Sequence, residues 1–77
     1  MTRRKGVETF GQRLRRLRHQ SGYLQQEAAA LSGTPDRTYR NWENDQSHPR
    51  YDGGPRMRRL AELYEVSVLY LFTGSDE

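Results

Sequence analysis

The 77-residue sequence contains no cysteine, which excludes a disulfide framework, a thiolate metal site and a cysteine nucleophile. It also lacks an apolar run of about 18 residues and a signal-peptide pattern, so we expect a cytoplasmic chain with no membrane partner. Only 32% of the residues are hydrophobic. At this length, that composition predicts one domain with one modest core.

Charge is distributed unevenly along the chain, although the net charge is only +3. Residues 1–20 carry seven basic side chains and one acid, whereas residues 60–77 carry four acids and no base. This segregation presents positive potential on one region, which favours a polyanion such as nucleic acid as the partner. A solvated charged surface is the alternative, and it explains the segregation less well.

The spacing of apolar residues predicts an all-α fold of five short helices without strands. Residues 1–8 lack this periodicity and are expected to form a flexible basic tail. The expected helices run from Thr9 to Gly22, over 24–32, over 35–44, from Pro55 to Val66-Ser67, and from Ser67 to Gly74. A loop dense in turn residues covers 44–55.

Capping signals mark the expected helix ends. Thr9 and Gln12 match a capping box, and Gly22 suits a left-handed C-cap. At the start of the third helix two interpretations stay open. Either Thr34 caps the helix, with Pro35 in the first helical position, or Asp36 caps it further along.

The third expected helix carries aromatic residues on one face and polar residues on the other. At about 100° per residue, Tyr39 and Trp42 share a face, and Arg37, Arg40 and Asn41 lie opposite. Trp42 is therefore expected to anchor the helix against the first two helices and to aim the polar side chains outward. Arginine bonds guanine and asparagine bonds adenine bidentately, so this face suits base recognition. The alternative is that any solvent-facing helix surface carries such residues.

The second and third helices, joined by a turn at Gly33-Thr34, predict a helix-turn-helix. In this unit the second helix enters the DNA major groove, and the N-terminus of the first approaches the backbone. Exposed N–H groups at such a terminus attract phosphate, and Gln25 is expected to lie there.

Over residues 9–74 the sequence resembles the lambda repressor and Cro-like (XRE-type) helix-turn-helix regulators. The most specific match is Trp-Glu-Asn at 42–44, preceded by Gln-x-Glu-x-Ala-x-x-x-Gly at 25–33. The ending LAELYEVSVLYLFTG, at 60–74, is similar to the family's ending. The resemblance implies a lambda repressor-like, five-helix DNA-binding domain over 9–74, flanked by tails at 1–8 and 75–77.

The resemblance also implies roles for individual residues. The implied DNA-binding residues are Gln25, Thr34, Asp36, Arg37, Arg40, Asn41 and Asn44. Gln25 would contact a phosphate, the side chains at 36, 37 and 41 would face base edges, and those at 40 and 44 would lie near the backbone. Arg18 and Glu43 would form a partly buried structural ion pair.

Several residues depart from the family's pattern. Leu24 stands where the family usually has a capping Ser or Thr, and Asp45 and Glu65 stand where it often has glycine. Asp36 is acidic at a base-facing position. It would be repelled by phosphate unless it accepts a hydrogen bond from a cytosine amino group or pairs with Arg37.

The predicted function is a sequence-specific DNA-binding transcriptional regulator, prokaryotic or phage-encoded, whose partner is double-stranded DNA. The last helix has more apolar surface than one short helix can bury, namely Val68, Leu69, Tyr70 and Phe72. Part of it is expected to form a homodimer seam on a two-fold operator, and the alternative is that all four residues are core.

A second function class is a protein-interaction module such as an antitoxin, with another protein as its main partner. An enzyme is not expected, because no motif places a nucleophile beside a base. His19 and His48 have no partners at metal-ligand spacing, so neither a metal nor a cofactor is predicted. Arg3, Arg4 and Lys5 would either follow the DNA backbone as an arm or remain unbound.

Overall fold

A computed structural model describes residues 8–49 and 54–75 of the chain. The helices in these ranges are α1 (Phe10–Ser21), α2 (Gln25–Ser32), α3 (Asp36–Glu43), α4 (Gly54–Leu63) and α5 (Val68–Thr73). The described residues contain no strand, so the all-α, five-helix prediction is confirmed. The expected arm of basic residues at 3–5 lies outside the described ranges.

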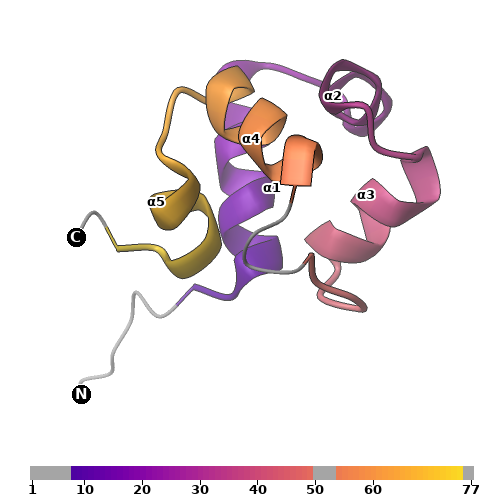
Figure 1. Cartoon of the computed structure of the whole chain (residues 1–77). Helices are drawn as coiled ribbons and strands as arrows, with labels where there is room; N and C mark the ends of the chain where they lie inside the picture. The colour runs from indigo at the N-terminus through magenta and orange to yellow at the C-terminus, as the bar shows by residue number, and fades with distance from the viewer. Residues whose placement is uncertain (1–7, 50–53, 76–77) are drawn as a thin grey trace.

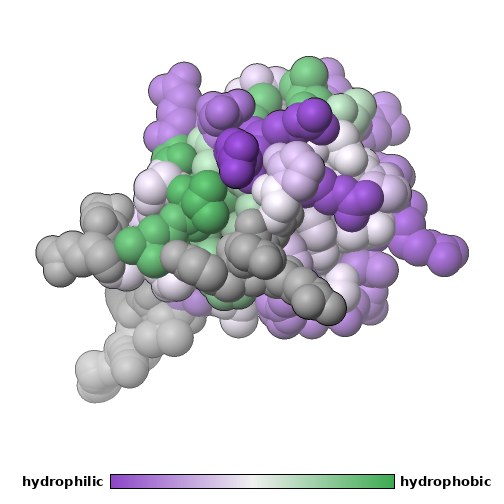
Figure 2. All heavy atoms as spheres, in the orientation of Figure 1, coloured by the Kyte–Doolittle hydropathy of each residue, from purple (hydrophilic) through white to green (hydrophobic). Residues whose placement is uncertain are grey.

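The helix α1 runs through the middle of the molecule, with α5 on one side and α3 on the other (Figure 1). The helix α2 packs against α3 and α4, and α4 in turn packs against α5. The core between them contains Phe10, Leu14, Leu17, Ala28, Ala29, Tyr39, Trp42, Met57, Leu60, Ala61, Tyr64 and Leu71. Figure 2 shows apolar side chains gathered over the α5 side of the visible face and hydrophilic side chains over much of the remainder.

The predicted capping of α1 is confirmed. Thr9 Oγ1 accepts a hydrogen bond from the Gln12 N–H, and Gln12 Oε1 accepts one from the Thr9 N–H, both at 3.0 Å. Gly22 ends the helix with φ 81°, the left-handed conformation that glycine adopts without steric cost. These local signals therefore define both ends of the longest helix.

The expected caps of α3 are wrong. The flanking residue is Pro35, the first helical residue is Asp36, and no side chain caps the helix. The Thr34 hydroxyl is instead buried and accepts a hydrogen bond from Ser32 Oγ at 2.9 Å. The hydroxyl groups of this turn therefore bond to each other, and neither caps the N-terminus of α3.

The start of α2 is only half capped. Leu24 is the flanking residue rather than the first helical one, and its side chain has no acceptor to offer. Glu27 Oε1 accepts the Leu24 N–H at 2.8 Å, which supplies the second half of a capping box. The other exposed N–H groups of this terminus consequently remain available at the surface.

Two arginines connect α1 to the chain ends. Arg13 is buried and donates to the backbone carbonyls of Leu71 and Phe72, each at 3.0 Å. Arg16 donates to Glu8 at 2.6 Å and to the Tyr70 hydroxyl at 2.7 Å. Glu8 was expected in the flexible tail, but this contact places it in the folded part.

No helix in the described ranges is long and apolar enough to cross a bilayer.

Candidate nucleic-acid interface

The two faces of α3 differ, since one is packed in the core and the opposite, outer face carries polar side chains. Tyr39 is fully buried and Trp42 is 4% exposed, with the Trp42 ring edge-on to Phe10 at a centroid distance of 6.4 Å. Arg37 is exposed and Asn41 is partly exposed. The helical rotation of about 100° per residue thus directs these two side chains away from the aromatic pair.

Asp36 and Arg40 form an ion pair on this outer face. Asp36 Oδ2 lies 3.3 Å from Arg40 Nη2, and each side chain is about half exposed, at 50% and 54%. Of the two ways left open for Asp36 to avoid repulsion by phosphate, pairing with Arg37 is not the one observed, because its partner in the free protein is Arg40. Residues one apart do not face each other on a helix, whereas residues four apart do.

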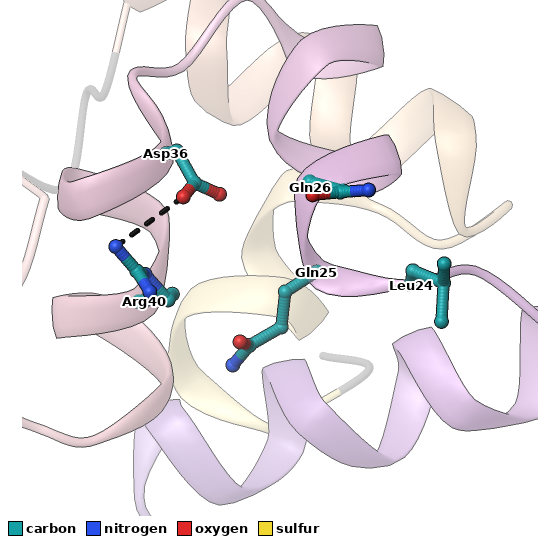
Figure 3. A pocket seen from close by; sticks show the side chains of 5 residues that line it. All are labelled: Leu24, Gln25, Gln26, Asp36 and Arg40. Atoms are coloured by element: carbon teal, nitrogen blue, oxygen red, sulfur yellow. Dashed lines mark ion pairs between the residues drawn. The ribbon is translucent and has the colours of Figure 1, made fainter.

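A shallow hollow separates the start of α2 from α3. It encloses about 320 Å³ and is lined by Leu24, Gln25, Gln26, Asp36 and Arg40. Figure 3 shows the ion pair between Asp36 and Arg40 lying along α3, with Leu24, Gln25 and Gln26 on the opposite side of the hollow. The residues that the sequence assigned to phosphate contact and to base contact are therefore neighbours on one surface.

Glu43 is the buried centre of a hydrogen-bond cluster at the end of α3. It is 2% exposed, and its carboxylate accepts two bonds from Arg18, at 2.6 Å to Oε2 and 3.1 Å to Oε1. Burial raises the pKa of Glu43, but the bonds from Arg18 and Gln25 outweigh it and leave the pKa below its usual range. The carboxylate is therefore ionised and fully matched by the guanidinium, which ties α1 to α3.

Gln25 takes part in the same cluster. Its Nε2 donates to Glu43 Oε1 at 3.0 Å, while the residue remains partly exposed. An ionised carboxylate is only an acceptor, so it bonds the amide nitrogen of Gln25 and not the amide oxygen. The amide nitrogen carries two hydrogens, of which this bond uses one. Glu43 therefore fixes the amide with its nitrogen toward the cluster and leaves one N–H for another acceptor.

Arg15 is a member of the cluster that the sequence did not single out. Its Nη2 donates to Asn44 Oδ1 at 3.0 Å, and its Nε lies 3.6 Å from Glu43 Oε1. Its side chain is 49% exposed. The available signal was its position three residues before Arg18, which places both on one side of α1.

Two groups of predicted site residues lie elsewhere. Thr34 is 5% exposed, so its side chain is not part of the surface and we leave it out of the interface. Val68, Tyr70 and Phe72 are partly buried at the margin of the core, and Leu69 is also partly exposed.

The histidines are both exposed. Among residues 8–49 and 54–75, no cluster of His, Cys, Asp or Glu is arranged to hold a metal ion.

Comparison with known proteins identifies the class of this domain. The model of the helix-turn-helix domain family matches residues 9–69, and the chain belongs to that family. The predicted helix-turn-helix family is thereby confirmed, and the predicted repressor-like fold is confirmed by the solved structures that share it. No curated protein sequence gives a significant match.

Solved structures share the fold. The P22 c2 repressor in complex with synthetic operator 9T gives a TM-score of 0.77 at 22% identity, covering 88% of this chain and 98% of that chain. The NMR structure of the P22 c2 repressor DNA-binding domain gives 0.76 at 20% identity, covering 95% of this chain and 92% of that chain.

Proposed function

We propose that the chain is a sequence-specific DNA-binding transcriptional regulator that reads the major groove with α3. The helix-turn-helix family and the repressor-like fold support the general function of a DNA-binding regulator. The observation that carries the specific proposal is the opposition of two faces on one helix. Tyr39 and Trp42 are buried, and Arg37 and Asn41 project outward on the second helix of the unit.

The outer face divides into two kinds of contact. Arg37 and Asn41 have the donor patterns that recognise guanine and adenine edges, each bidentate pair giving roughly 1–3 kcal/mol of discrimination. Gln25 and Asn44 flank this face at the start of α2 and the end of α3. Their amide groups suit phosphate oxygens, which position a protein on DNA without reading its sequence.

Selection from a random duplex library, followed by titration, tests this proposal. Affinity for the selected duplex should fall steeply as salt rises, because phosphate contacts release counterions. Arg37→Ala and Asn41→Ala should reduce discrimination between the selected duplex and single-base variants. Gln25→Ala should weaken binding to all duplexes about equally.

Two results would contradict the proposal. The first is an unchanged preference in both α3 variants. The second is weak, non-saturating DNA binding combined with a tight protein partner, which would support the antitoxin-like alternative.

We further propose that the protein binds as a homodimer through α5. Val68 and Leu69 are both partly exposed there, and a dimer would place two α3 helices about 34 Å apart, one turn of DNA. The Tyr70 hydroxyl is already bonded to Arg16, so it contributes less to such a seam. Sedimentation of the free protein and of its DNA complex tests the dimer, and a monomer in both states at high concentration would exclude it.

A further inference from the structure

We propose that Arg15 of α1 is a further DNA-backbone contact and that it also orients Asn44, so that α1 contributes to the interface beside α2 and α3. This inference rests on the proposed function, because it assigns one more residue to the same DNA surface. It rests on three observations, namely the charge balance around Glu43, the direction of two amide groups and the exposure of the guanidinium.

The positive charge of Arg15 is not neutralised by the charges around Glu43. Glu43 supplies one negative charge, and Arg18 matches it with two hydrogen bonds to the carboxylate. Arg15 contacts the same carboxylate at 3.6 Å, a longer distance with a side chain that is half exposed. The cluster therefore has a net positive charge at its surface, whereas the carboxylate alone would repel a phosphate.

The hydrogen bonds also determine how the neighbouring amides point. Arg15 Nη2 donates to Asn44 Oδ1, so the amide oxygen faces the arginine and the Nδ2 donor group is directed away from it. Glu43 Oε1 likewise holds Gln25 by its amide nitrogen. Each of the three side chains thus retains N–H donors for a phosphate, a preorganised arrangement that lowers the entropic cost of binding.

These donors lie within a small region. The oxygen Glu43 Oε1 is 3.0 Å from Gln25 Nε2 and 3.6 Å from Arg15 Nε. Neighbouring Arg16 points to the other side of α1, where it bonds Glu8 and Tyr70. Arg15 and Arg16 therefore lie on different surfaces of the protein. A substitution of Arg16 removes the same charge and serves as the control for a substitution of Arg15.

The test compares Arg15→Gln with Arg16→Gln. Binding is measured by fluorescence anisotropy to a labelled duplex recovered by selection and to a mixed-sequence duplex of equal length, over a series of salt concentrations. Arg15→Gln should lower affinity for both duplexes about tenfold at low salt and reduce the salt slope by about 1. Arg16→Gln should change the affinity by no more than about twofold, because its charge is farther from the DNA and is screened.

A double-mutant cycle tests the orienting role. Asn44→Ala should cost less affinity in the Arg15→Gln background than in the parent, because the amide has already lost the contact that orients it. Additive effects of the two changes would overturn this role. Circular dichroism at the binding temperature verifies that each variant is folded.

The two possible failures are distinguishable. Equal binding by the Arg15→Gln and Arg16→Gln variants, with Gln25→Ala still weakened, would overturn this inference and leave the proposed function intact. An absence of salt-dependent, saturable binding by the parent protein would overturn the proposed function itself.

Discussion

The carboxylate of Asp45 caps the start of α1 from a position 34 residues further along the chain. Its Oδ1 accepts the Gly11 N–H at 2.9 Å, and its Oδ2 accepts the Thr9 hydroxyl at 2.6 Å. Asp45 itself has φ 59°, in the left-handed region, at a position where the family often has glycine. The residue that turns the chain out of α3 therefore also satisfies a donor at the N-terminus of α1.

Stability should depend on the ionisation of Asp45. The Thr9 hydrogen bond lowers the pKa of this carboxyl below its ordinary value of 3.8. A group whose pKa is lowered on folding stabilises the protein above its unfolded pKa, and this contribution is lost as the pH falls through the folded value. Asp45→Asn should cost about 1–2 kcal/mol at pH 7 and little at low pH. Urea unfolding of both proteins from pH 2 to pH 7 measures the difference, and a constant difference would contradict the prediction.

Gly11 should not tolerate a side chain. A Cβ at this position would lie 2.5 Å from the Glu43 carbonyl oxygen and 2.6 Å from that of Trp42, so α1 would be forced away from α3. We expect Gly11→Ala to destabilise the protein by about 1–3 kcal/mol, despite the better helix propensity of alanine. Chemical denaturation measures the loss.

Gly22→Ala is the matched control for that experiment. A Cβ at Gly22 meets nothing within 4 Å, but its φ of 81° is unfavourable for alanine, at a cost of about 1–2 kcal/mol. A second change, Gly22→Asn, should recover part of this loss because asparagine tolerates the left-handed region, whereas Gly11→Asn should not recover. Equal recovery at both positions would show that steric contact with α3 is not the cause at Gly11.

The ion pair between Arg18 and Glu43 should behave as a coupled unit. Removing either partner alone leaves a charge in a nearly closed site, which typically costs about 3–5 kcal/mol. We expect Arg18→Met or Glu43→Met to approach this loss, and the double variant to lose less than the two single losses together. Denaturant midpoints of the four proteins give the coupling energy, and strictly additive losses would argue against a coupled pair.

Asp36 should limit the affinity of α3 for DNA in general while narrowing its choice of sequence. Its carboxylate pairs with Arg40 at 3.3 Å and adds negative charge to the proposed interface. Asp36→Asn should therefore strengthen binding to a mixed-sequence duplex and reduce discrimination at one base position. Glu62→Gln, on the exposed face of α4, is the charge-matched control. Similar gains in both variants would indicate net charge rather than the position of Asp36.

Local patterns accounted for the features of the fold that depend on neighbours in sequence. Each of three features depends on residues close together in one helix, namely the capping box at Thr9, the left-handed Gly22 and the opposite faces of Trp42 and Arg37. Such relationships are set by backbone geometry before any helix packs.

The relationships that sequence reasoning missed join distant segments. The bond from Gly11 to Asp45, and that from Arg15 to Asn44, require α1 and α3 to be placed first. The pairing of Asp36 with Arg40 is different, because its four-residue spacing was visible in the sequence. The buried Thr34 hydroxyl pairs with Ser32, only two residues away, but hydroxyl pairing in a turn has no distinctive sequence signal.

The contact of Arg13 with the final turn has a mechanical consequence. A six-residue helix is too short to be stable in water by itself. The α5 helix is therefore stabilised by its contacts with the rest of the domain. The Arg13 guanidinium donates to the last carbonyls of α5 and joins it rigidly to the central helix. In a dimer assembled through α5, these two arginines, one from each subunit, would fix the spacing and tilt of the paired reading helices.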